Sequence, residues 1–194
     1  MRRMHLYEVV LFLHILTLLA AIGLGTTLHH AEWSTRKATT VGQLRTMTGV
    51  YRRGNLFPIL IILLFGGGAW LLHLSRKRTE SFHFSDPWVW TAIVALVILM
   101  VTGGAVLGRH AARYEKLLAA TPEGPITPEV RAATFAPGTW ATSHMNTFLA
   151  IAVVFNMVTK PSDDASAIAV LVIGIVVGTV IGLAGARGRS VATV

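Results

Sequence analysis

Histidine is the residue type with the greatest chemical potential here, because the 194 residues include eight histidines and no cysteine. The lack of cysteine excludes disulfides, thiolate metal sites, iron–sulfur clusters and haem attached through cysteine. Imidazole can still serve as an axial ligand of a non-covalent haem b or as a ligand of copper. The chemistry therefore depends on which histidines the fold brings together.

Three histidines near predicted helix ends, His30, His110 and His144, are expected at one level of the bundle. Arg109 and Arg113 stand beside them, one helical turn apart, where they could hold haem propionates. This level offers both axial ligands and cations, and His110 and His144 are also candidate metal ligands. For three other histidines the preferred interpretation is a place among lipid headgroups without a ligand: His5, His29 and His83.

His14 differs because it lies about 12 Å along an apolar helix, which is too deep to reach the headgroups. A polar ring at that depth needs a partner inside the protein, such as Asn156, a backbone carbonyl or a cofactor. The glycine triplet 66–68 of the second apolar run is expected at the same depth, where it could admit a porphyrin plane. His14 is therefore a further candidate ligand for haem or a metal ion.

The composition places these histidines in a membrane protein. Mean hydropathy is +0.61, and only 13% of residues are charged, against roughly 25% in a soluble domain. A hydrocarbon core of about 30 Å needs about 20 residues of helix. Five apolar runs satisfy this length: 6–28, 56–74, 88–107, 140–158 and 165–186. The net charge of +8 does not indicate nucleic-acid binding, because the basic residues lie between these runs and not along one stripe.

The sequence therefore predicts a single all-α domain, residues 1–194, built as a bundle of five transmembrane helices. Apolar residues at three- and four-residue spacing over 39–53 predict an amphipathic surface helix after the first span, with its basic residues toward lipid headgroups. A threonine, a proline and an acid at 127–129 predict a short helix over 128–134. Eleven Lys and Arg residues on one side against six on the other place the N-terminus outside and the C-terminus in the cytoplasm of a bacterium.

Glycines at four-residue spacing predict close contacts between helices, because small residues let membrane helices approach each other. Gly104 and Gly108 form one such pair at the end of the third predicted helix. Gly174, Gly178 and Gly182 lie on one face of the fifth run. That face is expected to pack on another helix of the bundle, or on a partner in a homodimer or membrane complex.

Several short motifs carry a resemblance to a known family. They are His14 within the first helix, the exit His30-Ala31-Glu32, the entry Tyr51-Arg52-Arg53 with Pro58, then Gly66, Trp70 and Leu71, and the stretch 146–161. Over roughly residues 6–161 the chain resembles an uncharacterised bacterial family of small integral membrane proteins, distantly like the CopD copper-resistance proteins and the HemJ-type protoporphyrinogen oxidases. The HemJ-type resemblance implies haem b, with His14 as a candidate ligand and Arg52 and Arg53 near an anionic group.

Three functions are compatible with these patterns. The first is a haem b-binding membrane redox protein with ligands among four histidines: His14, His30, His110 and His144. The second is a copper-handling protein of CopD type, with Met4, His5 and His14 facing the outer side. The third is an accessory subunit without a cofactor that docks on a partner through its fifth helix. The sequence assigns no catalytic residue.

Overall fold

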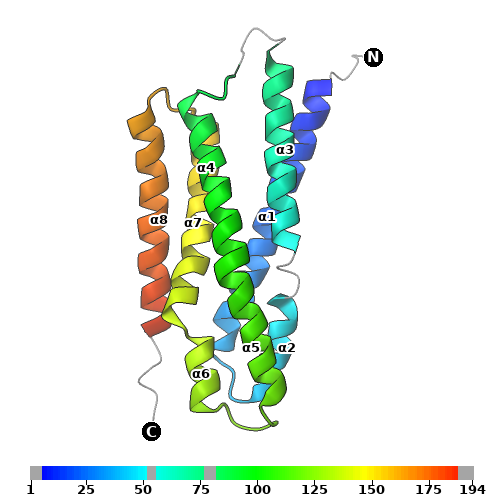
Figure 1. Cartoon of the computed structure of the whole chain (residues 1–194), viewed down its shortest axis with the longest axis vertical. Helices are drawn as coiled ribbons and strands as arrows, with labels where there is room; N and C mark the ends of the chain where they lie inside the picture. The colour runs from blue at the N-terminus through cyan, green and yellow to red at the C-terminus, as the bar shows by residue number, and fades with distance from the viewer. Residues whose placement is uncertain (1–5, 52–55, 77–81, 188–194) are drawn as a thin grey trace.

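The computed structural model describes residues 6–51, 56–76 and 82–187 (Figure 1). Within these segments five helices are long and apolar enough to cross a membrane. The elements in chain order are α1 (Leu6–Thr35), α2 (Val41–Tyr51), α3 (Phe57–Ser75), α4 (Pro87–Val101), the π-helical segment η2 (Thr102–Gly108), α5 (Arg109–Ala120), α6 (Pro128–Thr134), α7 (Pro137–Thr159) and α8 (Asp164–Arg187). The predicted all-α bundle with five spanning helices is confirmed.

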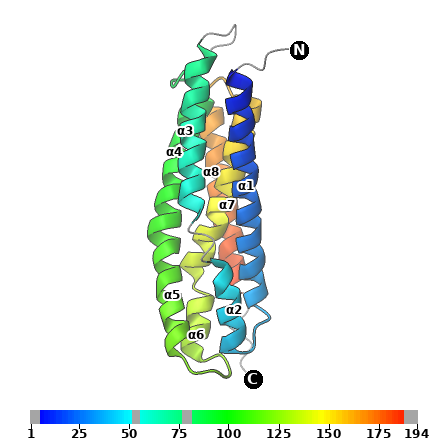
Figure 2. The ribbon, with the colours of Figure 1, turned by 90° about the vertical axis from the view of Figure 1, so that its right-hand side faces the viewer.

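The spanning helices run side by side along the long axis of the molecule (Figures 1 and 2). We call the end that carries α2 and α6 the basal end, and the opposite end the distal end. α8 finishes at the basal end, whereas α1 begins at the distal end. The most extensive helix pair is α7 with α8, followed by α1 with α3.

The first helix is longer than the apolar run that predicts it, because α1 continues past Leu28 to Thr35. The additional turns are stabilised by tertiary packing, since Ala31, Glu32 and Thr35 are all buried. A prediction from hydropathy places the end of the span at the last apolar residue, so it does not include this extension. These additional turns bring the carboxylate of Glu32 into the interior of the bundle.

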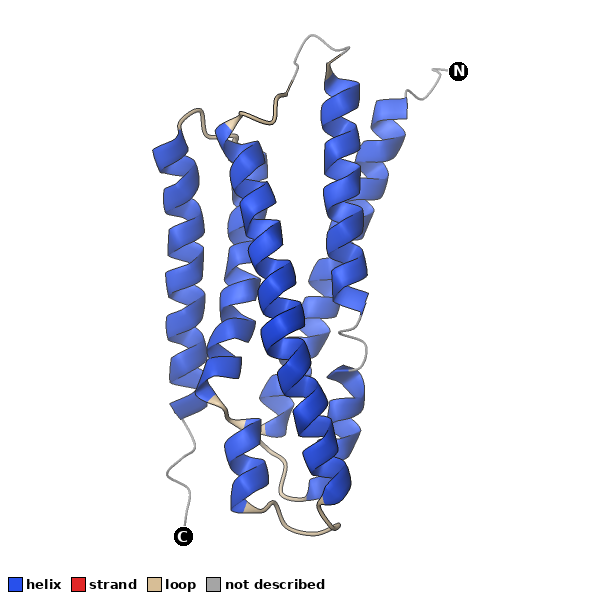
Figure 3. Ribbon diagram, in the orientation of Figure 1, coloured by secondary structure: helices blue, strands red, loops and turns tan. Residues whose placement is uncertain are grey.

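The third spanning helix is also longer than expected, because α4 continues through η2 and α5 without a break (Figure 3). The apolar run 88–107 predicts only the first part of this continuous helix, because α5 is amphipathic and buries Tyr114 and Leu118 at the basal end. The prediction that Gly104 and Gly108 pack on another helix is wrong, since both are exposed and neither faces a neighbouring helix within 4 Å. These glycines lie instead in the π-helical segment, where low helix propensity permits a widened turn.

The amphipathic helix after the first span is present as α2, but its apolar face packs on protein. Val41 and Leu44 are fully buried against Tyr114, Leu118 and Val130 of α5 and α6. Burial of five large side chains gives the basal end its own small core. Arg45 of α2 lies next to this core and donates hydrogen bonds to the Leu118 carbonyl of α5.

The short helix α6 begins as predicted. Pro128 is its first residue, and the Thr127 hydroxyl accepts a hydrogen bond from the Val130 N–H at 3.3 Å. This satisfies one of the amide groups that the start of a helix leaves open. The cap fixes the point at which the chain turns back toward α7.

The glycine face of α8 lies directly on α7, so the prediction of close packing within the bundle is confirmed. A Cβ atom added at Gly178 would lie 2.6 Å from the carbonyl oxygen of His144, and one at Gly174 would lie 2.8 Å from that of Phe148. Gly182 makes the same kind of approach one turn further on. Because α7 covers this face, it is not available to a second protein while α8 holds this position.

Polar contacts hold the distal end of α8. The indole N–H of Trp90 donates to the Asp164 carboxylate at 2.9 Å, which links α4 to α8. The Ser166 backbone N–H donates to the exposed Asp163 carboxylate at 2.8 Å, and this bond holds the pKa of Asp163 below its usual value. The buried Asn156 side chain donates to the Ala167 carbonyl at 3.0 Å. α8 is therefore anchored to the bundle along its whole length.

Candidate metal centre

Three potential metal ligands converge where α1 and α7 meet near the basal end. His29 and Glu32 lie about one turn apart on α1, so their side chains project from the same face. His144 comes from α7, and the ligating atoms of the three residues all lie within 4.8 Å of one another. Glu32 and His144 are buried, and His29 is half-buried. In the described parts of the chain no other three His or acidic residues converge in this way.

The carboxylate of Glu32 is the hub of this cluster. Its Oε2 atom accepts hydrogen bonds from His29 Nδ1 at 3.1 Å and from the Ser143 hydroxyl at 3.0 Å. The other ring nitrogen of His29 bonds to the hydroxyl of Thr147. One face of α7 therefore supplies two hydroxyls and an imidazole to two ionisable residues of α1. Burial of a carboxylate such as that of Glu32 is costly in a membrane helix unless hydrogen-bond partners satisfy it.

The His144 ring is held in one orientation. Its Nδ1 atom lies 3.0 Å from the Trp140 carbonyl oxygen. A carbonyl can only accept, so Nδ1 carries the proton and Nε2 of the neutral ring keeps its lone pair. A hydrogen bond from the second nitrogen is the usual means by which proteins orient a metal-binding histidine.

Two tryptophans and an arginine close the basal side of the cluster. The Trp140 ring stacks on His144 with centroids 5.7 Å apart, and Trp33 meets the same imidazole edge-on at 6.3 Å. The Arg36 guanidinium lies 4.3 Å from the centroid of Trp33 and 5.2 Å from that of Trp140. It also donates to the carbonyl of Gly185 near the end of α8. We call Trp33, Arg36 and Trp140 the aromatic clamp, which ties α1, α7 and α8 together beside the cluster.

Two imidazoles and one carboxylate form a ligand set known from zinc, copper and non-haem iron sites. A tetrahedral ion with bonds of about 2.0 Å separates neighbouring ligands by about 3.3 Å. The observed 3.1 Å between His29 Nδ1 and Glu32 Oε2 is close to that separation. The cluster could therefore accept a metal ion with small side-chain adjustments. Ser143 would remain bonded to the carboxylate and would orient it.

Of the histidines expected together at this level, only His144 belongs to the cluster. His30 is exposed on α1, because neighbouring residues of a helix point about 100° apart and His29 takes the inward direction. His110 lies on α5, where its ring stacks on Tyr114 with centroids 6.0 Å apart. The sequence patterns predict a headgroup position for His29 and no role for Glu32, so they do not identify two of the three members. The spacing of a histidine and an acid three residues apart is the signal that could have identified them.

His14 lies against α3 at the expected depth. A Cβ atom added at Gly67 would lie 3.1 Å from His14 Nδ1, and one at Gly68 would lie 3.6 Å from Cε1. The predicted juxtaposition with the glycine triplet is therefore confirmed, but the ring itself occupies the space that the glycines leave. Its Nδ1 is buried without a hydrogen-bond partner. The alternative partner Asn156 bonds instead to α8 and to Thr91.

Two further candidates lie on α5, apart from both positions. Arg109 and Arg113 are exposed on α5. Four others fall outside the described residues: Met4, His5, Arg52 and Arg53. The two arginines expected to hold haem propionates, Arg109 and Arg113, therefore do not lie beside His14 or His144.

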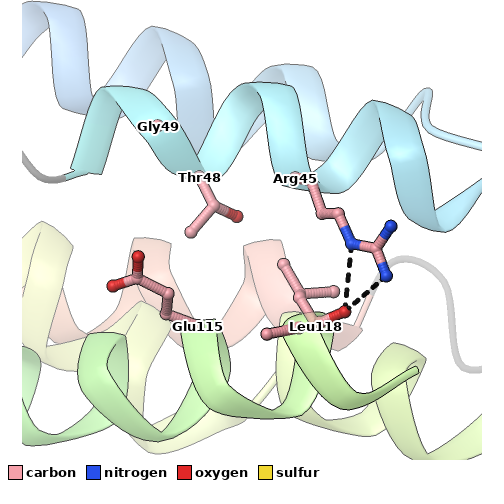
Figure 4. A pocket seen from close by; sticks show the side chains of 6 residues that line it. Arg45, Thr48, Gly49, Glu115 and Leu118 are labelled. Carbon is pink, nitrogen blue, oxygen red and sulfur yellow. Dashed lines mark hydrogen bonds between the residues drawn. The ribbon is translucent and has the colours of Figure 1, made fainter. Parts of the chain in front are cut away.

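A shallow pocket of about 170 Å³ lies between α2 and α5 (Figure 4). Arg45 stands at its edge, but the guanidinium donates to the Leu118 carbonyl at 2.9 and 3.1 Å and to the Glu123 carboxylate at 3.1 Å. These bonds cap the end of α5, so the prediction that this stretch turns its basic residues toward lipid is wrong for Arg45. The other two basic residues of the stretch, Arg52 and Arg53, lie outside the described residues. Because its cation is engaged in this way, the pocket is a weaker candidate for chemistry than the cluster.

Comparison with known proteins identifies the family of this chain. No curated protein and no solved structure is similar enough to match the chain. A family model described as a predicted integral membrane protein matches residues 8–161, which run from α1 to just past α7 and leave out α8. This is nearly the span over which the sequence motifs predict a resemblance to an uncharacterised membrane family. The chain therefore belongs to the DUF2269 family of predicted integral membrane proteins.

Proposed function

We propose that this protein binds a transition-metal ion in the bacterial cytoplasmic membrane and takes part in handling that metal. The observation that carries the proposal is the convergence of His29, Glu32 and His144 from two helices, with their ligating atoms within 4.8 Å. Nitrogen and carboxylate ligands suit Cu²⁺, Zn²⁺ or Fe²⁺. The resemblance to CopD copper-resistance proteins favours copper among these ions.

The decisive experiment measures metal binding by the purified, metal-stripped protein. The purification tag must lack histidine, and Cu²⁺ and Zn²⁺ are titrated separately by calorimetry. We expect one ion per chain. His144→Ala and Glu32→Gln should each weaken binding more than about 100-fold, which is the upper range for losing a group that only orients a ligand.

The matched control uses the two adjacent histidines of α1. His29→Ala should abolish binding, whereas His30→Ala should leave it unchanged because the exposed His30 points away from the cluster. Equal losses for both variants, or full affinity in His144→Ala, would contradict the proposed site.

We also infer that the basal end faces the cytoplasm. The support is the excess of Lys and Arg in the segments that connect helices at this end. The chain has no cysteine, so Ser34→Cys provides a single label near the end of α1. An impermeant maleimide should label it only after cells are opened, and labelling of intact cells would reverse the orientation.

A haem b redox protein is the second candidate, and the unpartnered Nδ1 of His14 is the observation that favours it. An imidazole nitrogen inside a membrane helix would be satisfied by an iron atom. The packing does not fit a porphyrin between His14 and Gly67, because the two are already in contact. Protein from cells supplied with a haem precursor should therefore lack a Soret band, and a band lost in His14→Ala would favour haem over the metal site.

A further inference from the structure

α5 carries its charges on two distinct sides. Its packing face buries Tyr114 and Leu118 against α2 and α6. Arg109, Arg113 and Lys116 are all exposed, at positions that a helix of 3.6 residues per turn places on one stripe.

The one acid of α5 lies away from this stripe. Glu115 lines the pocket toward α2, opposite Thr48 and Gly49 (Figure 4). The structure records no carboxylate partner for the three basic residues of the stripe, all of which belong to its described part. The stripe therefore presents three positive charges to its surroundings without an internal counter-charge.

The position of the stripe along the spanning helix is well defined. Pro87 begins α4, and Arg109 follows 22 residues later, or about 33 Å along the axis. That distance is slightly more than a hydrocarbon core of about 30 Å. Arg113 lies about 6 Å further and Lys116 about 10 Å further. If Pro87 marks the distal boundary of the hydrocarbon core, this spacing would place the three side chains in the headgroup layer at the basal end.

We propose that Arg109, Arg113 and Lys116 bind the phosphate of an anionic phospholipid at the basal face of the membrane. Two guanidiniums one turn apart can both donate to a single phosphate, and their geometry suits bidentate contacts. Lys116 adds a charge within about one Debye length of the surface. This binding is independent of the metal proposal, because the stripe contributes no ligand to the cluster.

The test compares phosphatidylglycerol with phosphatidylcholine, which has no net charge. Each lipid is titrated into the detergent-solubilised full chain, and bound lipid is counted by native mass spectrometry. We expect phosphatidylglycerol to bind more tightly, with about a fivefold loss of affinity for each basic residue removed. Arg109→Gln/Arg113→Gln should therefore reduce the preference by about 25-fold.

The matched control is Arg76→Gln, which removes an exposed arginine at the distal end. It should leave the phosphatidylglycerol preference unchanged. The proposal is overturned if phosphatidylcholine binds equally well, or if the double variant keeps the wild-type preference. Secondary-structure spectra of each variant confirm that the helices are retained, and metal titration of the same samples reports separately on the cluster.

Discussion

Two histidines on one helix have opposite surroundings. His29 lies at the contact of α1 with α7, where Glu32 and the Thr147 hydroxyl bond both of its ring nitrogens. His14 lies at the contact of α1 with α3, where its Nδ1 faces glycine backbone without a hydrogen-bond partner. The two residues are about 22 Å apart along the helix. His29 therefore belongs to a hydrogen-bonded cluster, whereas the His14 ring fills the space beside the glycines of α3.

The difference shows that the partner helix decides what a membrane histidine can do. α7 presents Ser143, His144 and Thr147 on one face, and all three contribute polar groups at the same level. The facing part of α3 has no side chains to offer, because it consists of glycines. Depth in the membrane is therefore a weaker guide to a binding site than the chemistry of the opposing helix.

The largest effect is expected at the α7–α8 contact that supports the polar site. In Gly178→Leu the new side chain meets the carbonyl oxygen of His144, which a Cβ atom would already approach to 2.6 Å. Backbone cannot move aside as a flexible side chain can, so we expect a loss of about 3 kcal/mol in stability together with weakened metal binding. Thermal unfolding in detergent measures the first effect and metal titration the second.

The control for this substitution is Gly23→Leu on α1, where a Cβ atom would meet nothing within 4 Å. It should unfold at the wild-type temperature. If Gly178→Leu behaves in the same way, the α7–α8 packing described here is wrong.

A smaller loss is expected where α3 contacts His14. Gly67→Leu must displace the imidazole ring, since a Cβ atom would lie 3.1 Å from Nδ1. The obstacle is a side chain, so we expect a cost of about 1–3 kcal/mol and no change in metal affinity. Gly66→Leu is the matched control, because no atom lies within 4 Å of a Cβ added there. Equal destabilisation by both variants would show that His14 does not occupy the glycine gap.

Much of the fold follows from the sequence because its signals are local. Apolar runs of about 20 residues define the spans, and the threonine and proline at 127–128 define the start of α6. The glycine face of α8 predicts close packing, but not the identity of the partner helix. That choice depends on the whole bundle, and the structure assigns it to α7.

The candidate site is less predictable because it depends on the rotation of α1 about its own axis. His29 and His30 are neighbours, and a sequence without a clear apolar face cannot show which of them points inward. Most of α1 faces outward from the bundle, so its polar residues are the main indication of its inner side. The extension of α1 to Thr35 brings Glu32 into the helix, and neither hydropathy nor the family motifs reveal that extension.

The aromatic clamp of Trp33, Arg36 and Trp140 lies beside the metal-ligand cluster, where both tryptophans contact the His144 ring. Arg36→Ala removes the cation that lies on Trp33 and Trp140, and Trp140 in turn holds the His144 ring. We expect metal affinity to fall about 10-fold, as for other groups that orient a ligand. The Cu²⁺ absorption spectrum should also shift, which a merely structural loss would not produce.

Two variants control for the loss of charge in this experiment. Lys37→Ala removes the neighbouring exposed cation and should leave both affinity and spectrum unchanged. Arg36→Lys keeps a cation near the rings and should restore part of the affinity. An Arg36→Ala protein with wild-type affinity and spectrum would show that the clamp does not position His144.

The smallest effect is expected for His14→Leu, and its sign distinguishes the two histidines. Replacing a buried polar group that has no hydrogen-bond partner by an apolar side chain of similar size removes a desolvation cost. We expect stability to stay within about 1 kcal/mol of wild type or to rise slightly. His29→Leu should have the opposite effect, because it removes the imidazole hydrogen bond to the buried Glu32 carboxylate, a change that costs about 1.5–3 kcal/mol. Thermal unfolding of both variants in the same detergent measures the difference, and a marked loss of stability in His14→Leu would show that His14 has a partner that its contact with α3 does not reveal.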